Sequence, residues 1–488
     1  MLIFAPLIWG ANLPLPLLIL ELSSVGLLLY VAHKPGFRSQ LPLSLQLALL
    51  VLLLLPLAQL IPIPNGLWSL LPGRGYYAQA LQEVPGPATT TRPITLVPWA
   101  TERAGLAILP PIMVFLVTVS LSSQHLQRLI YLFLGIATFQ AILGLIQYGD
   151  VPDSLFRLGN PYMDGNAFGT YINRNHLAGL LEMALPVGLA LLTATVGHAP
   201  RPADHARRGL RQRLATLTTL RVNVAFVYGT ISIALLLGLT FTRSRMGIAM
   251  AMLGILLCIL AFTRRLGGWN VYGLAGTVTA AGIGLATLIG LAPILTRFAD
   301  DPLGDARWSI ASAALHAAGE FFPLGSGNGT FTQIFWRFYP PQIQFDGIID
   351  RAHNDYLEWI VEGGIVILGL LAIFLFGYVR QWSKVWQRGS WPTFRFVQVG
   401  AGISVLVMSV HSFVDFNLHI PANAIFFALL AAAFMHTPLS EPDEQQSNEP
   451  QRPRRHKKRP HRHRLDEPMH EARSRTIPSE NQINPFSE

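Results

Sequence analysis

The sequence predicts an all-α integral membrane protein: a polytopic bundle of about 11 or 12 transmembrane helices with one large loop on the outer side. Two observations carry this prediction. Hydrophobic residues make up 51% of the 488 residues and charged residues only 13%. The apolar residues also come in blocks of about 20, the length that crosses a bilayer core. A soluble domain of this size would not have such a pattern.

The blocks place the spans in order along the chain. They are predicted at 13–32, 41–61, 103–120, 128–149, 175–196, 222–241, 246–263, 270–292, 355–379, 397–417 and 420–436. Residues 1–11 are a candidate for a twelfth, short span. No basic segment precedes the first apolar block, so no signal peptide is expected. The single cysteine, Cys258, lies inside a span, which excludes a disulfide framework.

The basic residues predict the orientation. All lysines lie on one side, together with dense arginine runs, and that side is expected to be the cytoplasm. Its basic residues include Lys34, Arg38, Arg128, Arg201, Arg207, Arg208, Arg211, Arg213, Arg221, Arg264, Arg265, Arg380, Lys384, Arg388 and Arg395. The basic residues of the opposite, periplasmic side are arginines, among them 157, 174, 243, 245, 297, 307, 337 and 351. The use of arginine without lysine on this side favours binding of phosphate or carboxylate groups, because a guanidinium group can bind two of their oxygens at once.

The predicted organisation has five parts. They are the N-terminal spans and first periplasmic loop at 1–100, a central bundle at 101–292, a large periplasmic loop at 293–353, C-terminal spans at 354–436, and a basic cytoplasmic tail at 437–488. The tail contains an Arg-, Lys- and His-rich run at 452–464 and is expected to be disordered. We favour attraction to anionic inner-leaflet lipids over nucleic-acid or metal binding for this run.

The large loop holds two candidate features. Asp305 is placed to cap a short helix near 307–319, whose apolar residues would lie on the membrane surface. The segment Gly325-Ser-Gly-Asn-Gly329 follows. It has the glycines of a phosphate cradle but neither the full Walker pattern nor its lysine, so a tight turn is favoured.

Chemistry is expected where the loop enters the next span. Asn354 is a good N-cap, and Asp355 and Glu358 complement the dipole of the first turn. His353 therefore lies at a positive helix end, which favours a neutral imidazole that accepts a proton. A capping or interfacial histidine is the simpler alternative. Arg351 is expected to pair with the nearby carboxylates.

Two further strings lie at the periplasmic ends of spans. One is Asn-Arg-Asn-His-Leu-Ala-Gly at 173–179, which contains Arg174, Asn175 and His176. The other is Thr-Arg-Ser-Arg-Met-Gly at 242–247, in a turn between two spans. It holds Arg243 and Arg245 at the membrane surface. Arginines at such depth are costly unless paired or solvated, so they are functional candidates; contact with lipid phosphates is the alternative.

These two strings and Ala-His-Asn-Asp-Tyr-Leu-Glu at 352–358 resemble, in this order, the O-antigen ligase and polymerase superfamily. The stretch Pro-Leu-Gly-Ser-Gly-Asn-Gly-Thr-Phe at 323–331 and the spacing from His353 to Gly364 are similar to that family as well. The resemblance covers roughly 105–435. It implies an integral-membrane, C-type glycosyltransferase that takes a glycan from an undecaprenyl-diphosphate carrier in the periplasm. The acceptor would be a lipopolysaccharide core in a ligase and a second lipid-linked glycan in a polymerase.

The residues themselves fit such a reaction. A sugar–diphosphate bond that breaks leaves negative charge on phosphate, which a metal or cationic side chains must stabilise. No Asp-x-Asp pair occurs on the periplasmic side, so no metal or cofactor is expected. Arg174, Arg245 and Arg307, with Arg243, are predicted to bind the diphosphate, while His353 takes the acceptor proton for an inverting displacement. Asp355 or Glu358 is the less favoured base.

A transporter or flippase for an anionic lipid or solute is the alternative of a different class. Its arginines would line a pathway across the membrane. Here the arginines gather at one face, and no pair of broken helices in matching halves is evident. The enzyme is therefore the favoured prediction, in the bacterial inner membrane with its site facing the periplasm.

Overall fold

The computed structural model describes residues 1–33, 41–83, 89–149, 154–160, 165–197, 220–266, 306–340, 349–386 and 391–437, and the single residues 276, 280 and 284. All of these residues lie within one compact unit, Met1–Leu439. The predicted span at 270–292, the predicted cap Asp305, Arg297 and the basic tail lie outside the described stretches.

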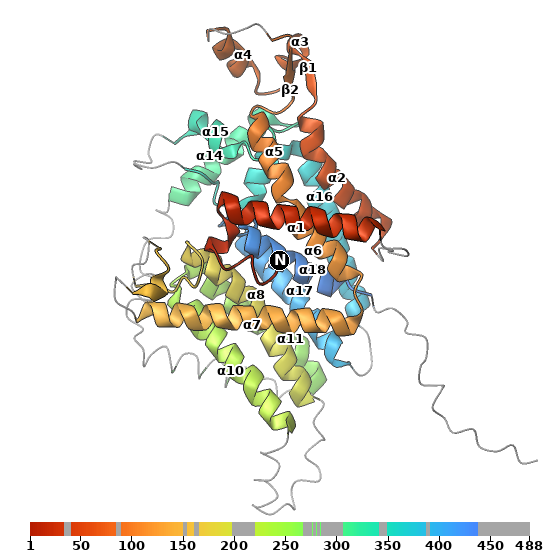
Figure 1. The fold of residues 1–488 in the computed structure, drawn as a ribbon, viewed down its shortest axis with the longest axis vertical. Helices are drawn as coiled ribbons and strands as arrows, with labels where there is room; N and C mark the ends of the chain where they lie inside the picture. The colour runs from red at the N-terminus through yellow and green to blue at the C-terminus, as the bar shows by residue number, and fades with distance from the viewer. Residues whose placement is uncertain are drawn as a thin grey trace, which may run out of the picture. The chain divides into compact units, whose positions relative to one another are not determined.

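The described elements are almost all helices (Figure 1). They are η1 (Trp9–Ala11), α1 (Pro14–His33), α2 (Leu43–Gln59), β1 (Pro62–Pro64), α3 (Asn65–Trp68), α4 (Gly75–Gln82), β2 (Thr91–Pro93), α5 (Pro98–Ala107), α6 (Leu109–Val119), α7 (Ser123–Tyr148), η2 (Leu155–Arg157), α8 (Arg174–Gly197), α10 (Leu220–Phe241), α11 (Arg245–Leu266), α14 (Ala306–Phe321), α15 (Phe331–Ile334), η4 (Phe335–Phe338), α16 (Asp355–Val385), α17 (Thr393–His411), η5 (Asn417–His419) and α18 (Pro421–Met435).

Eight of the described helical segments are long and apolar enough to cross a membrane. They are Pro14–His33, Pro98–Val119, Ser123–Tyr148, Arg174–Val196, Asn223–Phe241, Arg245–Thr263, Asp355–Val385 and Thr393–His411. The predictions at 41–61 and 420–436 correspond to the shorter apolar helices α2 and α18. The prediction of an all-α polytopic membrane protein is confirmed. The sequence left open whether residues 1–11 form a twelfth span; in the structure residues 2–8 form turns and η1 follows directly, so they do not.

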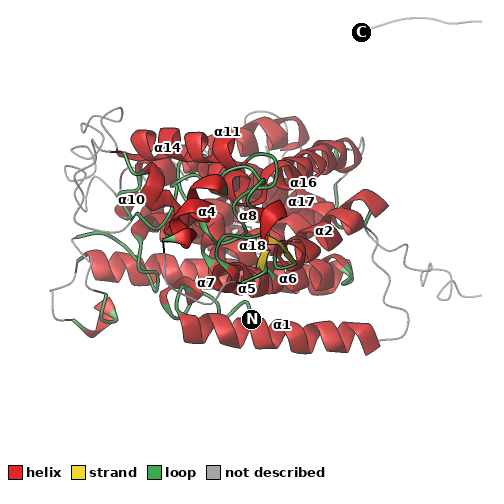
Figure 2. Ribbon diagram, turned by 90° about the horizontal axis from the view of Figure 1, so that it is seen from above, coloured by secondary structure: helices red, strands yellow, loops and turns green. Residues whose placement is uncertain are grey.

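Helix α8 forms the centre of the bundle (Figure 2). The whole apolar window of this span is buried, as expected for a helix that is hydrophobic all round. It packs against α7, α10, α11 and α17. Small residues allow this close approach: an added Cβ on Gly400 of α17 would lie 2.8 Å from the Ala190 Cβ. Helices pack in a bilayer through such small-residue contacts.

The glycine-rich segment after α14 packs onto a kink in α16. Gly364 interrupts α16 with φ 54° and ψ −134°, a conformation that favours glycine. A Cβ added there would lie 2.0 Å from the carbonyl oxygen of Pro323, and one added to Gly325 would lie 2.3 Å from the Glu362 carbonyl oxygen. Both glycines are therefore required for the close contact of the two backbones.

Candidate functional site

Backbone amides in the glycine-rich segment bind the protein's own acceptors. The N–H groups of Gly325, Ser326 and Gly327 donate to the carbonyls of Phe321, Val361 and Glu362, at 2.8–3.0 Å. The next amides donate to Gln59 Oε1, to the Glu362 carboxylate and to Gly327 O. A phosphate cradle would need these donors unoccupied. The segment is thus a structural turn, in agreement with the favoured interpretation of the sequence.

The three sequence strings meet at one end of the bundle. In the 173–179 string, an added Cβ on Gly179 would lie 2.5 Å from Asn417 Oδ1. In the 242–247 string, an added Cβ on Gly247 would lie 2.6 Å from the Ala178 Cβ. The 352–358 string joins through Asp355, whose N–H donates to the Ser412 carbonyl at 2.9 Å. Each string thus contacts another string or the segment after α17.

Arginines stand at the first position of two neighbouring helices. Arg174 begins α8 and Arg245 begins α11, and these helices pack together. Arg174 Nη1 donates to Asn166 Oδ1 at 3.0 Å. Arg243 lies in the turn before α11 with φ 55°, and its buried Nε has no hydrogen-bond partner among the described residues. The positive end of the helix dipole repels an arginine at a helix N-terminus. An anion bound there is stabilised by the helix dipole and by the arginine. The arrangement therefore suits a bound anion.

Asn354 caps α16 as predicted. Its side chain accepts the Leu357 N–H at 3.0 Å. Just before it, His353 adopts a left-handed conformation with φ 50°, which is uncommon for a residue other than glycine. Its ring meets Phe416 edge-on at 5.1 Å, and His176 meets the same Phe416 ring at 4.8 Å. His353 and His176, both predicted from the sequence, therefore pack against the same Phe416 ring.

Asp415 is the partner of His353 that the sequence analysis missed. The two side chains approach to 3.7 Å between Nδ1 and Oδ1, and Asp415 is 1% exposed against 26% for His353. Arg307 Nη1 lies 3.8 Å from Asp415 Oδ2 and donates to the Val414 carbonyl at 3.0 Å. Burial would raise the pKa of Asp415, but His353 and the charges of Arg307, His176 and His411 outweigh it and lower that pKa. Asp415 is therefore an anion that joins Arg307 to His353.

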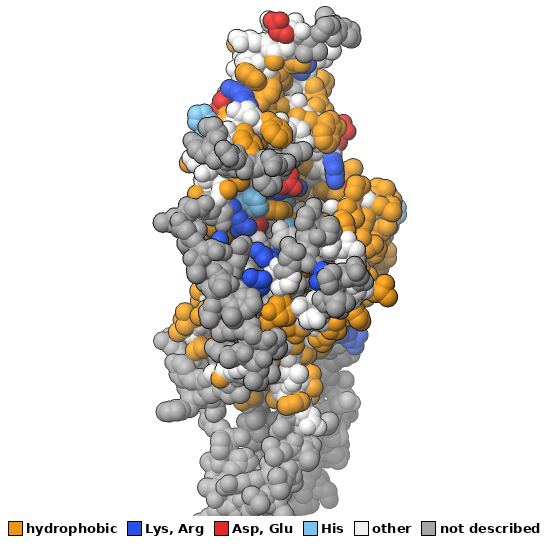
Figure 3. All heavy atoms as spheres, turned by 90° about the vertical axis from the view of Figure 1, so that its left-hand side faces the viewer, with side chains coloured by type: hydrophobic (Ala, Val, Ile, Leu, Met, Phe, Trp, Pro, Cys, Tyr) orange, Lys and Arg blue, Asp and Glu red, His pale blue; other side chains and the backbone are white. Residues whose placement is uncertain are grey.

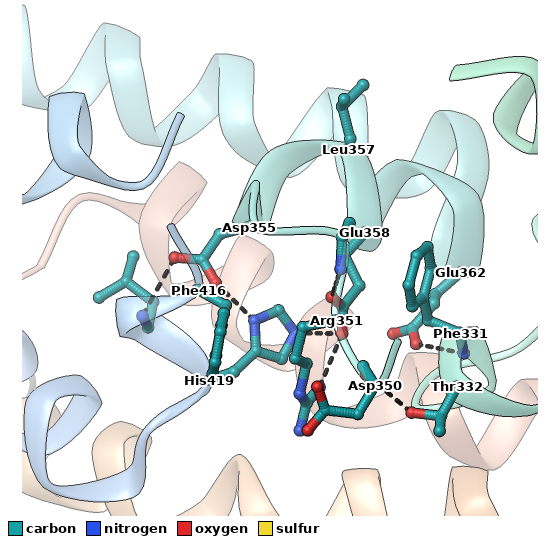
Figure 4. Close-up of polar contacts among 12 residues, drawn as sticks. Phe331, Thr332, Asp350, Arg351, Asp355, Leu357, Glu358, Glu362, Phe416 and His419 are labelled. Carbon is teal, nitrogen blue, oxygen red and sulfur yellow. Dashed lines mark hydrogen bonds and ion pairs between the residues drawn. The ribbon is translucent and has the colours of Figure 1, made fainter. Parts of the chain in front are cut away.

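A four-membered charged cluster, Arg351–Glu358–His419–Asp355, lies beside this pair (Figure 4). Arg351 Nη1 is 2.6 Å from Glu358 Oε1, and the Ala352 N–H donates to Glu358 Oε2 at 3.0 Å. His419 places Nδ1 2.5 Å from Asp355 and Nε2 3.2 Å from Glu358. Both carboxylates are fully buried and have partners, which disfavours either one as the base toward an acceptor.

A second buried pair connects the core helices. Glu182 of α8 and His411 of α17 lie 2.9 Å apart, and neither side chain is exposed. An ionisable pair at this depth costs desolvation energy and is rare in membrane spans. His411 acts electrostatically on Asp415, so this second pair extends the His353–Asp415 pair toward the bundle interior. In the sequence, the signal for this pair was Glu182, a carboxylate within the span predicted at 175–196.

The expected helix in the large loop is present as α14. Its Ile310, Ala314 and Phe321 are buried in a small core with Phe331 and Phe335, while Trp308 and Leu315 are 57% and 63% exposed. Thus one face of α14 packs on the loop's own aromatic residues. Its first turn carries Arg307 to Asp415.

Charged side chains gather at one face of the molecule. Figure 3 shows basic, acidic and histidine side chains together at mid-height, with apolar side chains above and below them. No group of three His, Cys, Asp or Glu side chains suited to a metal ion occurs in the described part of the chain. We take as the candidate site the arginines in the first turns of α8, α11 and α14 together with the His353–Asp415 pair.

The comparison with protein families agrees with this architecture. Residues 230–374 match the family described as O-antigen ligase, a range that includes the 242–247 and 352–358 strings and the glycine-rich turn. No curated protein matches the chain. This match on a helical membrane bundle supports membership of the O-antigen ligase superfamily.

Proposed function

We propose that the protein transfers a glycan from undecaprenyl diphosphate to an acceptor hydroxyl on the periplasmic face of the inner membrane. The family implies glycan transfer of the ligase or polymerase type. The observation that carries the finer proposal is His353 paired with a buried, anionic Asp415, next to arginines at helix N-termini. One group of residues can move a proton and the other can bind a diphosphate.

In the proposed reaction, His353 is the general base. In the tautomer with the proton on Nδ1, which faces Asp415, Nε2 can accept the proton of the acceptor hydroxyl. The hydroxyl oxygen then bonds to the anomeric carbon while the bond from that carbon to the diphosphate oxygen breaks, and the configuration inverts. The 3.7 Å separation from Asp415 is long for a hydrogen bond. Such contacts commonly tighten when substrate binds.

The arginines bind the leaving group. Arg174, Arg245 and Arg307, with Arg243, would hold the diphosphate oxygens, and the N-termini of α8 and α11 add positive potential. Arg307 also contacts Asp415, so it links the leaving-group site to the base. Asn175 and His176 lie at the start of α8: the Asn175 N–H donates to Asn173 Oδ1 at 2.8 Å, and His176 is buried behind it.

The test is transfer by the purified protein in liposomes, with a lipid-diphosphate glycan as donor. Product is expected with lipopolysaccharide core as acceptor and is expected to persist in EDTA, because arginine replaces a metal at the diphosphate. Product only with a second lipid-linked glycan would establish the polymerase alternative. A metal requirement would contradict the arginine-only mechanism. Movement of an anionic substrate across the bilayer without transfer would establish the transporter alternative.

The orientation has its own test. Gln333→Cys after α14 and Ser383→Cys at the end of α16 both place an exposed thiol, on a Cys258→Ser background. A membrane-impermeant maleimide is expected to label position 333 in intact cells and position 383 only after lysis, because lysines mark the cytoplasmic side. The reverse pattern would put the proposed site in the cytoplasm.

A further inference from the structure

His419 holds its imidazole between two carboxylates. Nδ1 faces Asp355 Oδ1 at 2.5 Å and Nε2 faces Glu358 Oε1 at 3.2 Å. A neutral imidazole has one N–H and one lone pair, so it can donate to only one of two acceptors. With both carboxyls ionised, the geometry needs N–H on both nitrogens, which is the imidazolium form. With Arg351, the cluster then contains two cations and two anions.

This cluster joins the two segments that make the proposed catalytic pair. Arg351, Asp355 and Glu358 belong to the segment that carries His353, while His419 belongs to the segment that carries Asp415. Glu358 also accepts the Ala352 N–H, directly before His353. The cluster therefore contacts the chain on both sides of His353, which has a left-handed backbone conformation: at the Ala352 amide before it and at Asp355 after it.

We propose that His419 is a positioning residue that keeps His353 against Asp415, and that loss of its second ring proton at alkaline pH releases this alignment. The inference rests on the proposed role of His353 as the base. When either nitrogen of His419 loses its proton, a lone pair faces a buried carboxylate. The repulsion separates the two segments that the cluster joins.

The pKa of His419 supports the direction of the effect. Burial lowers it, but Glu358 and the hydrogen bond to Asp355 raise it more, and the opposing charge of Arg351 does not cancel this increase. Among the elements packed on η5, α16 carries Asp355, Glu358 and the buried Glu362, α18 has no titratable residue, and α8 offers Arg174, His176 and Glu182. Because the folded pKa is raised above the unfolded value, the stabilisation is complete below the unfolded pKa and is lost as pH rises through the folded pKa.

The first measurement is the pH profile of kcat for the wild type, His419→Gln and the control His316→Gln. His316 lies on α14, near Phe338 and away from the cluster. The wild type and control are expected to show an alkaline decline. His419→Gln should lose about 10- to 100-fold in kcat at neutral pH with little change in donor KM, since a misplaced base affects the chemical step, and its profile should lack that decline.

The second measurement is hydrogen exchange of the peptide over 349–358, which needs no catalysis. His419→Gln is expected to speed its exchange, including the Ala352 amide, whereas His316→Gln should not. If His419→Gln showed faster exchange but a wild-type pH profile of kcat, the cluster would only stabilise the local structure, and the positioning role would be overturned. Unchanged exchange would also overturn it. An active His353→Ala enzyme would instead refute the proposed base, and the exchange result would still report whether His419 holds the segment.

Discussion

Replacing His353 with alanine is expected to lower the transfer rate by about 10²–10⁴-fold, the usual contribution of a positioned general base. Binding of the lipid-diphosphate donor should stay near normal, because the arginines contact the diphosphate in the proposed site. Transfer with purified donor and acceptor gives the rate, and photo-crosslinking of a donor analogue gives binding. Of the clustered His353, His176 and His411, only His353 is more than slightly exposed, which makes it the one that an acceptor can reach.

His316→Ala is the matched control, because this histidine lies on α14 near Phe338. It should retain full activity. Asp415→Asn should fall between the wild type and His353→Ala, since the amide keeps the shape but removes the anion that stabilises an imidazolium. Full activity of His353→Ala would make this histidine a structural residue at the start of α16.

Replacing Arg174, Arg245 or Arg307 with lysine is expected to lower the rate by about 10²–10³-fold, or about 2.7–4 kcal/mol of transition-state stabilisation. Lysine retains the charge but not the planar fork that binds two oxygens at once. At Arg307 the change also weakens the contact with Val414 and Asp415. The measurement is kcat for each variant, together with its abundance in the membrane.

Arg337→Lys is the control for these variants. Arg337 is paired with Glu320 at 2.5 Å and lies over the Tyr76 ring, apart from the residues assigned to the site. Its activity should equal that of the wild type. If Arg174→Lys, Arg245→Lys and Arg307→Lys were all fully active, their arginines would serve only to anchor the protein at lipid headgroups.

Local signals in the sequence predicted much of this molecule. Apolar blocks of membrane-spanning length gave the helices, and the cap at Asn354 is formed by the predicted atoms. The strings around Arg174, Arg245 and His353 were recognisable because each is continuous in the chain. The tight turn favoured at 325–329 is also present, and Gly325 has a backbone conformation and a contact that exclude a side chain.

Pairings between distant segments could not be predicted in the same way. Asp415 was placed within the span predicted at 397–417, whereas α17 ends at His411 and the chain then turns to present Asp415 to His353. A carboxylate in a predicted span is a functional signal by itself, and Asp415 and Glu182 both gave that signal. The sequence did not say which histidine each would meet.

The sequence by itself thus determined the membrane class and most of the helices, and it suggested the residue types of the proposed site, because hydrophobic length, capping and charge act over a few turns of chain. Only the tertiary structure decided that His353 faces Asp415 and that His419 bridges Asp355 and Glu358. Those contacts depend on how α8, α16 and α17 pack, and this packing places side chains from distant parts of the chain together in a buried region where unpaired charges are costly.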